Sequence, residues 1–201
     1  MTRLVPCILW GAGVAGWYAI RYPHEARARR TPVRRVNDRL WEAVLLGISS
    51  IGLLVVPLAW AVTGWPGAAD YAISPVQVAA GALVFAGALR LFARTHRDLG
   101  KNWSAALKVR ENHRLVTGGV YARVRHPMYA AFWLWAFAQA LLLPNLVAGG
   151  VGLAGFGTLY FLRVGREERL MLGMFGDEYR AYMARTGRLI PRRRLGRPER
   201  P

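Results

Sequence analysis

Residues 130–162, AAFWLWAFAQALLLPNLVAGGVGLAGFGTLYFL, form an uncharged stretch that is too long to cross a membrane once. A single membrane-spanning helix needs about 20 apolar residues. Pro144-Asn145 lies at the middle of the stretch, and such a pair is typical of turns. The sequence therefore predicts two short helices, each about five turns long, that form a hairpin.

Three further apolar stretches precede this hairpin, at Leu4–Ile20, Trp41–Trp65 and Ala72–Ala93. Each is near the length that one membrane-spanning helix requires. Together with the hairpin they predict about five crossings in an all-α integral membrane protein, with residues 1–201 as one membrane domain. Arg3 before the first stretch also fits an export signal, but the arginines that follow the stretch resist translocation and favour a retained helix.

The composition of the 201 residues agrees with a membrane protein, because 54% are hydrophobic and only 19% are charged. So apolar a chain is not expected to be disordered. A net charge of +17 would suggest a nucleic-acid partner in a soluble protein. Here the arginines lie between the apolar stretches, so we predict the lipid bilayer as the partner and no nucleic acid.

The basic residues are concentrated in alternate loops. Segments 21–40, 94–125 and 163–201 hold seven, eight and eleven Lys and Arg residues, whereas Asp70 is the charged residue of segment 66–71. Cytoplasmic loops carry the Lys and Arg excess in membrane proteins. The pattern predicts an N-terminus outside and the three basic segments on the cytoplasmic side. We expect the basic tail, residues 192–201, to lie on anionic lipid.

The chain divides into three N-terminal spans, residues 1–93, and a region richer in functional residue types, residues 94–191. In the second region, residues 99–129 read LGKNWSAALKVRENHRLVTGGVYARVRHPMY, which is too polar to span a membrane. The pair Gly118-Gly119 permits a tight turn or a close backbone approach to a ligand.

Arg125 and His126 precede Pro127, a residue that suits the first turn of a helix. Both side chains would then lie at the N-terminus of the fourth span. Because a helix N-terminus favours negative charge, a carboxylate-bearing ligand is expected there. The alternative is that the two residues mark the lipid boundary.

A second group of charged residues follows the fifth span. Arg163 and Glu167 are four residues apart and share one helix face, with Glu168 beside them. Ionisable groups at membrane depth are costly and need partners. Either Arg163 and Glu167 form an ion pair worth a few tenths of a kcal/mol, or the carboxylates hold cationic groups of a ligand while Arg163 holds an anionic one.

Four aromatic residues lie near this group in the sequence: Tyr160, Phe175, Tyr179 and Tyr182. They either line the same site or belong to the belt of aromatic residues at the membrane surface. For each residue taken singly, the belt is the favoured interpretation.

No metal site is predicted, because Cys7 is the single cysteine and the histidines His24, His96 and His113 have no ligands at suitable spacing. The sequence also lacks a Walker loop, GxSxG and GxGxxG, which argues against a nucleotidase, a serine hydrolase and a soluble Rossmann enzyme.

Two motifs in this order resemble the isoprenylcysteine carboxyl methyltransferase family, part of a wider group of membrane methyltransferases that includes phospholipid N-methyltransferases. The first motif, G-x-Y-x-x-x-R-H-P-x-Y, comprises Gly119, Tyr121, Arg125, His126, Pro127 and Tyr129. The second comprises Glu167, Glu168, Phe175, Gly176, Tyr179 and Tyr182 and closes with Arg188-Leu189-Ile190-Pro191. The resemblance covers roughly residues 95–191. Ala131 and Met171 depart from the family pattern and affect only local helix packing.

The resemblance implies a cytoplasm-facing pocket for S-adenosylmethionine with a lateral opening for an amphipathic or lipid-linked acceptor. It implies six cofactor-binding residues: Gly119, Val120, Tyr121, His126, Tyr129 and Glu167. Arg163, one turn before the paired glutamates, is the residue that it associates with catalysis and the acceptor. Arg125 and Glu168 complete the candidate catalytic set.

Methyl transfer from a sulfonium needs no nucleophilic side chain, because the donor already carries an excellent leaving group. A carboxylate acceptor is ionised at pH 7 and needs no base, so carboxyl O-methylation of a prenylated thiol is the leading prediction. A phospholipid amine or a small thiol is the alternative within the class, with Glu168 as the base. An NADPH-dependent membrane reductase and a non-enzymatic lipid-binding protein are the alternatives of other classes.

Overall fold

The computed structural model describes residues 3–29, 34–35, 39–100, 108–109 and 115–192. Within them the fold is almost entirely helical. The exception is a pair of two-residue antiparallel strands, β1 (Arg34–Arg35) and β2 (Lys108–Val109). Part of segment 94–125, including His113, and nearly all of the tail 192–201 lie outside the described residues.

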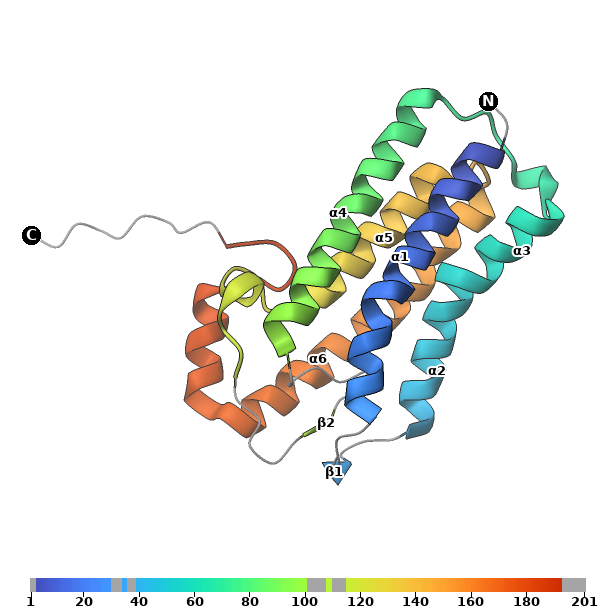
Figure 1. The fold of residues 1–201 in the computed structure, drawn as a ribbon. Coiled ribbons are helices and arrows are strands. Elements are labelled where there is room, and N and C mark those ends of the chain that lie inside the picture. Colours follow the sequence, from blue (N-terminus) through green and yellow to red (C-terminus); the bar gives the residue numbers. More distant parts are fainter. Residues whose placement is uncertain (1–2, 30–33, 36–38, 101–107, 110–114, 193–201) are drawn as a thin grey trace, which may run out of the picture.

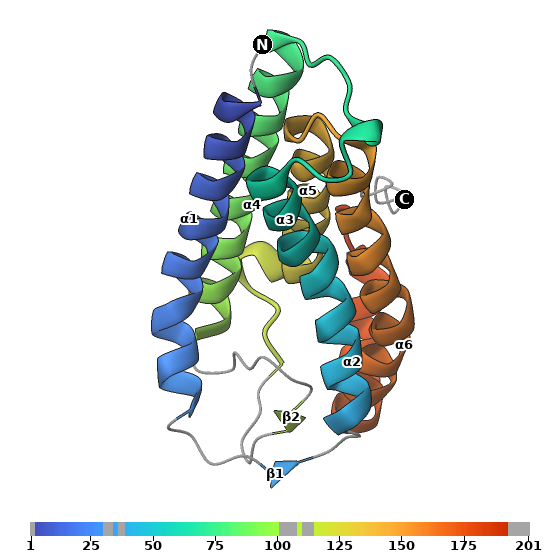
Figure 2. The same cartoon turned by 90° about the vertical axis from the view of Figure 1, so that its right-hand side faces the viewer.

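The long helices run side by side along one direction (Figures 1 and 2). α1 comprises Leu4–Arg29 and α4 comprises Pro75–Leu99. Between α1 and α4 in the sequence, α2 (Arg39–Ser50), a π-helical turn (Ile51–Val55) and α3 (Val56–Thr63) form one continuous rod. The remaining elements are the 3₁₀ turns η2 (Gly67–Ala69) and η4 (Gly119–Ala122) and the helices α5 (Pro127–Leu142) and α6 (Leu146–Arg185).

Four of the described helices are long and apolar enough to cross a membrane: Leu4–Ala26, Leu40–Thr63, Pro75–Leu99 and Leu146–Arg185. α5 is a shorter apolar helix. With 16 residues it is about 24 Å long, less than the thickness of the hydrocarbon core, as expected for a half of the hairpin. These helices confirm the predicted all-α integral membrane fold.

The predicted hairpin is confirmed at Pro144-Asn145. α5 ends at Leu142 and α6 begins at Leu146. The Asn145 side-chain oxygen accepts hydrogen bonds from the backbone N–H groups of Val147 and Ala148 at 3.0 and 2.8 Å. This capping satisfies N–H groups that the first turn of α6 leaves unpaired.

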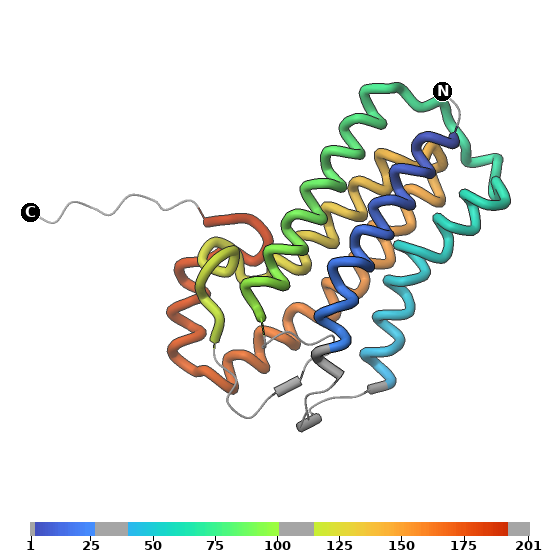
Figure 3. The backbone as a smooth tube through the Cα atoms, in the orientation of Figure 1, coloured from blue at the N-terminus to red at the C-terminus, as the bar shows by residue number. Residues whose placement is uncertain are grey.

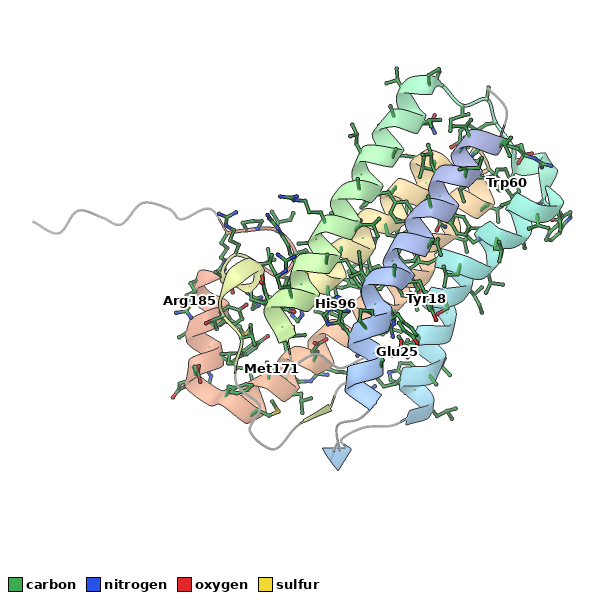
Figure 4. The ribbon with its side chains drawn as sticks, in the orientation of Figure 1. Tyr18, Glu25, Trp60, His96, Met171 and Arg185 are labelled. Atoms are coloured by element: carbon green, nitrogen blue, oxygen red, sulfur yellow. The ribbon has the colours of Figure 1, made fainter. Side chains whose placement is uncertain are left out.

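α6 is longer than the five turns predicted for it. It extends through the charged residues beyond Leu162 and bends at Gly176, whose φ of 50° is open to glycine but unfavourable for other residues. The last turns therefore fold back toward the start of α5 (Figure 3), and Arg185 lies on this returning part (Figure 4). The length was missed because the apolar stretch ends long before the helix does.

The connections gather at the two ends of the bundle. The start of α1 and the link from α3 to α4 lie at one end, and the end of α1 and the start of α2 lie at the other (Figures 1 and 2). At the first end Asp70 accepts hydrogen bonds from Trp60 Nε1 at 2.8 Å and from Asn145 Nδ2 at 2.6 Å. These bonds join the α3–α4 link to the hairpin turn, and Figure 4 shows Trp60 at this end.

The end of α2 and the π-helical turn that follows it pack closely against α6 because glycines face each other. A side chain at Gly52 would place its Cβ 2.6 Å from the Val151 carbonyl oxygen, and one at Gly155 would place it 2.8 Å from the Ile48 carbonyl oxygen. The contact sets the register of the two helices, since small residues allow backbones to approach closely. Gln139 of α5 donates hydrogen bonds from Nε2 to the carbonyl oxygens of Gly52 at 3.0 Å and Ala148 at 2.9 Å.

Candidate active site

The start of α5 is joined to the chain that leaves α6. The backbone N–H groups of Arg125 and His126 donate to the carbonyl oxygens of Gly187 and Arg188 at 2.8 and 2.9 Å. A Cβ at Gly187 would lie within 1.8 Å of the Ile190 carbonyl oxygen, so no larger residue fits without a shift. Arg125 and Gly187 are 62 residues apart in the sequence, so these bonds bring the two motifs together.

Glu168 lies at the centre of an ionic group that we call the Glu168 cluster: Glu168, Arg125, His126 and Arg188. Arg125 donates from Nε and Nη2 to Glu168 Oε1, both at 3.2 Å, and His126 Nε2 lies 3.3 Å from the same oxygen. Arg188 donates from Nε to both carboxylate oxygens at 3.1 Å and from Nη2 to Oε2 at 2.5 Å. The hydrogen bond to Glu168 raises the pKa of Arg188. The carboxylate is 4% exposed, and its lone pairs are committed to these donors.

Arg125 also ties this cluster to the end of α6. Its Nη1 donates to the carbonyl oxygens of Met183, at 3.1 Å, and of Thr186. Thr186 is fully buried and donates from its hydroxyl to the Tyr182 carbonyl oxygen at 2.6 Å. Arg125 therefore satisfies carbonyl groups that the C-terminal turn of α6 leaves unpaired.

Tyr129 and Glu167 form the second contact between α5 and α6. The buried Tyr129 hydroxyl donates to Glu167 Oε2 at 2.6 Å, and Glu167 is half-buried. The Tyr129 ring lies 5.4 Å from the His126 ring and 5.5 Å from the Tyr160 ring, measured between centroids. The structure thus places His126, Tyr129 and Glu167, three of the predicted cofactor residues, together.

Arg163 pairs with a residue that the sequence motifs do not contain. Its Nη1 lies 3.3 Å from Oε2 of Glu42, near the start of α2, and each side chain is 11% exposed. Of the two alternatives for Arg163, the i,i+4 ion pair with Glu167 is not seen among the described residues, because Glu42 faces the guanidinium and Tyr129 binds Glu167. We call Arg163, Glu42, Tyr129 and Glu167 the Arg163 cluster.

The Arg163 cluster leaves polar atoms without hydrogen bonds. Among the described residues, buried Arg163 Nε has no partner. Glu42 Oε2 lies within ion-pair distance of Arg163 but accepts no well-directed hydrogen bond. Buried polar atoms are normally satisfied, so each exception calls for a partner such as a bound water, ion or ligand. A ligand with an acceptor group could satisfy Arg163 Nε.

The glycine loop is anchored to the end of α4. Gly119 has a φ of 59°, which agrees with the predicted tight turn, and a Cβ there would lie 2.2 Å from Asp98 Oδ2. The backbone N–H of Val120 donates to the same oxygen at 2.8 Å. Glycine is therefore required for the close approach of Asp98.

Tyr121 connects this loop to the returning part of α6. Its carbonyl oxygen accepts a hydrogen bond from the Tyr182 hydroxyl at 2.6 Å. The Tyr121 side chain is itself buried, and burial raises the pKa of its phenol because the charged form loses hydration. Gly119, Val120 and Tyr121 thus lie between the end of α4 and the end of α6.

Three residues of the site were not predicted from the sequence. The sequence also left open whether the nearby aromatic residues line the site or lie at the membrane surface. Glu42, Asp98 and Thr186 carry no motif signal, although a lone glutamate beside an apolar span is itself an indication of function. Burial of the aromatic side chains favours the lining interpretation over an interfacial belt for three of them: Tyr160, Tyr179 and Tyr182.

Comparison with known protein families identifies one family for part of the chain. Residues 79–173 match the model of the isoprenylcysteine carboxyl methyltransferase family. The predicted resemblance to this family is confirmed. The match includes the motif residues from Gly119 to Glu168 and excludes both Glu42 and Arg188.

The individual relatives are methyltransferases of two kinds. The protein-S-isoprenylcysteine O-methyltransferase of Schizosaccharomyces pombe is 36% identical over 86 residues, 43% of this chain and 36% of the relative. Methanethiol S-methyltransferase 1 of Bradyrhizobium diazoefficiens is 43% identical over 82 residues, 40% of this chain and 27% of the relative. The matches thus span well under half the length of these relatives.

A solved structure supports the same fold. A eukaryotic intramembrane Ras methyltransferase of the isoprenylcysteine carboxyl type superposes with a TM-score of 0.52 at 23% sequence identity. The superposition covers 78% of this chain and 54% of the other. It extends the likeness beyond the half of the chain that matches the family.

Proposed function

We propose that the protein is an S-adenosylmethionine-dependent membrane methyltransferase that O-methylates the carboxylate of a prenylated thiol or a similar amphipathic acceptor. The observation that carries the proposal is the meeting of the two motifs of the isoprenylcysteine carboxyl methyltransferase family, with His126 and Tyr129 of α5 against Glu167 and Glu168 of α6. The buried, unsatisfied Nε of Arg163 supports an anionic acceptor.

The residues present fit the methyl donor. Its cationic groups suit the half-buried Glu167 carboxylate, which the Tyr129 hydroxyl holds in place, and His126 lies next to Tyr129. The Val120 N–H already donates to Asp98, so we assign the segment Gly119–Tyr121 to shaping the pocket wall rather than to donating that N–H. The donor supplies a methyl group on a sulfonium, so the C–S bond breaks as the C–O bond forms and the electron pair stays on sulfur.

The protein's own contribution is to orient the acceptor and exclude water. Arg163 would hold the acceptor carboxylate through Nε and so direct one oxygen at the methyl group. No proton has to move, because the carboxylate is already ionised. Arg125 would support the reaction by fixing Glu168 and the end of α6, without touching the acceptor.

A small-thiol S-methyltransferase is the second candidate, because the methanethiol S-methyltransferase match has 43% identity. A thiol acceptor must lose a proton, and Glu168 is the predicted base. Glu168 is already bonded to Arg125, His126 and Arg188, which leaves it poorly placed to accept a proton. This contact set supports a carboxylate acceptor over a thiol.

We also propose that the site faces the cytoplasm and the N-terminus lies outside. The ends of α1 and α4 and the start of α2, which flank arginine-rich segments, lie toward one end of the bundle, while the N-terminus lies at the other (Figure 2). The positive-inside rule then supports the orientation.

Methyl transfer by the purified full chain tests the function. Radiolabelled S-adenosylmethionine is incubated in detergent with N-acetyl-S-farnesylcysteine, methanethiol or phosphatidylethanolamine as acceptor. Label in a base-labile ester of the first acceptor is expected, and label only in the thiol or the amine would replace the proposed acceptor. Stabilisation of the protein by NADPH but not by S-adenosylmethionine in a melting assay would contradict the methyltransferase itself.

A further inference from the structure

Glu42 lies outside the residues that match the isoprenylcysteine carboxyl methyltransferase family, yet it contacts the proposed acceptor arginine. It is the acidic residue in the first turn of α2 and is buried. A carboxylate at this depth beside an apolar helix is costly unless it is paired. Its partner is Arg163 Nη1, at 3.3 Å.

The glycine contact of α6 with α2 and the π-helical turn that continues it sets this pairing. The helices run antiparallel, as the contacts of Gly52 with Val151 and of Gly155 with Ile48 require. Glu42 lies six residues before Ile48 and Arg163 lies eight residues after Gly155. The same register that brings the glycines together therefore brings the carboxylate to the guanidinium.

The ion pair occupies only part of the guanidinium. Arginine can hold a carboxylate at the edge formed by Nη1 and Nη2 or at the edge formed by Nε and Nη2. Glu42 contacts Nη1, while Nε is buried and has no hydrogen-bond partner among the described residues. The edge that contains Nε is thus the one left for an acceptor.

We propose that Glu42 is a positioning residue that holds Arg163 by Nη1 and presents the Nε edge to the acceptor carboxylate. The inference rests on the proposed function and adds a residue of α2 to it. Glu42 also competes electrostatically with an anionic acceptor, because both are attracted to the same cation. Positioning therefore governs the rate of transfer, whereas the charge of Glu42 weakens acceptor binding.

These opposing effects separate in a kinetic experiment. Glu42→Gln keeps the side-chain size and removes the charge. With N-acetyl-S-farnesylcysteine as acceptor, we expect kcat to fall about tenfold or more because the guanidinium loses its fixed orientation. The acceptor KM should stay level or fall, and the dissociation constant of S-adenosylhomocysteine should change less than twofold.

Glu25→Gln is the matched control, because Glu25 on α1 (Figure 4) forms an ion pair with Arg21 at 3.0 Å. It should leave kcat and KM unchanged. Glu42→Asp keeps the charge on a shorter side chain and should give an intermediate kcat with the wild-type KM. If Glu42→Gln does not fold, the kcat of Glu42→Asp tests the proposal instead.

Two results would overturn the inference while leaving the proposed function intact. One is a wild-type kcat in both Glu42 variants. The other is a joint worsening of kcat, KM and cofactor binding, which is expected of a purely structural ion pair. Absence of transfer by the wild-type protein to any carboxylate acceptor would instead remove the proposed function, and the inference with it.

Discussion

The Glu168 cluster and the Arg163 cluster lie next to each other on α6, but their polar atoms are satisfied to different degrees. Glu168 is bonded to Arg125, His126 and Arg188. Arg163 has one ion pair and a buried Nε without a hydrogen bond among the described residues. A fully bonded ionic group fixes the positions of helices, whereas an incompletely bonded one can gain free energy from a ligand. We therefore assign a structural role to Glu168 and Arg125. We assign ligand binding to the Arg163 cluster, in which Arg163 would hold the acceptor and Glu167 the cofactor.

The largest effect on stability is expected from Glu168→Gln. Loss of this buried carboxylate leaves the Arg125 guanidinium without its counter-charge, which costs about 3 to 5 kcal/mol in comparable buried pairs. The melting temperature of the detergent-purified apo protein should fall sharply. Asp177→Asn, which removes an exposed partner of Arg180, is the control and should melt like the wild type. A wild-type melting temperature for Glu168→Gln would contradict the structural role.

Glu167→Gln should weaken cofactor binding more than it weakens the fold. Loss of a charge-assisted hydrogen bond costs about 1.5 to 3 kcal/mol, or roughly a ten- to hundredfold change in affinity. Calorimetric titration measures the dissociation constant of S-adenosylhomocysteine for the variant and the wild type. Glu178→Gln, on the exposed side of α6, provides the comparison. If the two variants bind equally well, Glu167 does not belong to the cofactor site.

Tyr129→Phe is expected to have the smallest effect. The variant keeps the ring packing against Tyr160 and loses the 2.6 Å hydrogen bond to Glu167. One hydrogen bond to a charged group is worth about 1.5 kcal/mol or somewhat more, so the affinity for S-adenosylhomocysteine should fall about tenfold at the same melting temperature. In a double-mutant cycle with Glu167→Gln the losses should not add, and full additivity would show that the contact does not matter for binding.

The membrane-spanning helices could be predicted from the sequence because they depend on composition and a few turn residues. The apolar stretches have the length of the bilayer, and Pro144-Asn145 marks the hairpin turn. The returning end of α6 could not be predicted in this way. It depends on the left-handed backbone of Gly176 and on the hydrogen bonds of Arg125 to the end of the helix, which are tertiary contacts.

The motif residues of the site could be named in advance, but their partners could not. Tyr129 and Glu167 are 38 residues apart in sequence, and their hydrogen bond depends on how α5 packs against α6. Glu42 lies in a stretch without a motif, and its place depends on the glycine register of α2 and α6. The place of Asp98 could not be predicted either, because it depends on the close approach of its carboxylate to Gly119 in the folded protein.

The most direct test of the account is Arg163→Lys, assayed for methyl transfer to N-acetyl-S-farnesylcysteine alongside its cofactor affinity and melting temperature. Lysine keeps the charge and can still pair with Glu42, but it has no Nε edge for a carboxylate. We expect turnover to fall about a hundredfold, while cofactor affinity and melting temperature change little. Near-normal turnover in the lysine variant would contradict the acceptor role of Arg163, and an equal loss of turnover and cofactor affinity would place Arg163 in the cofactor site instead.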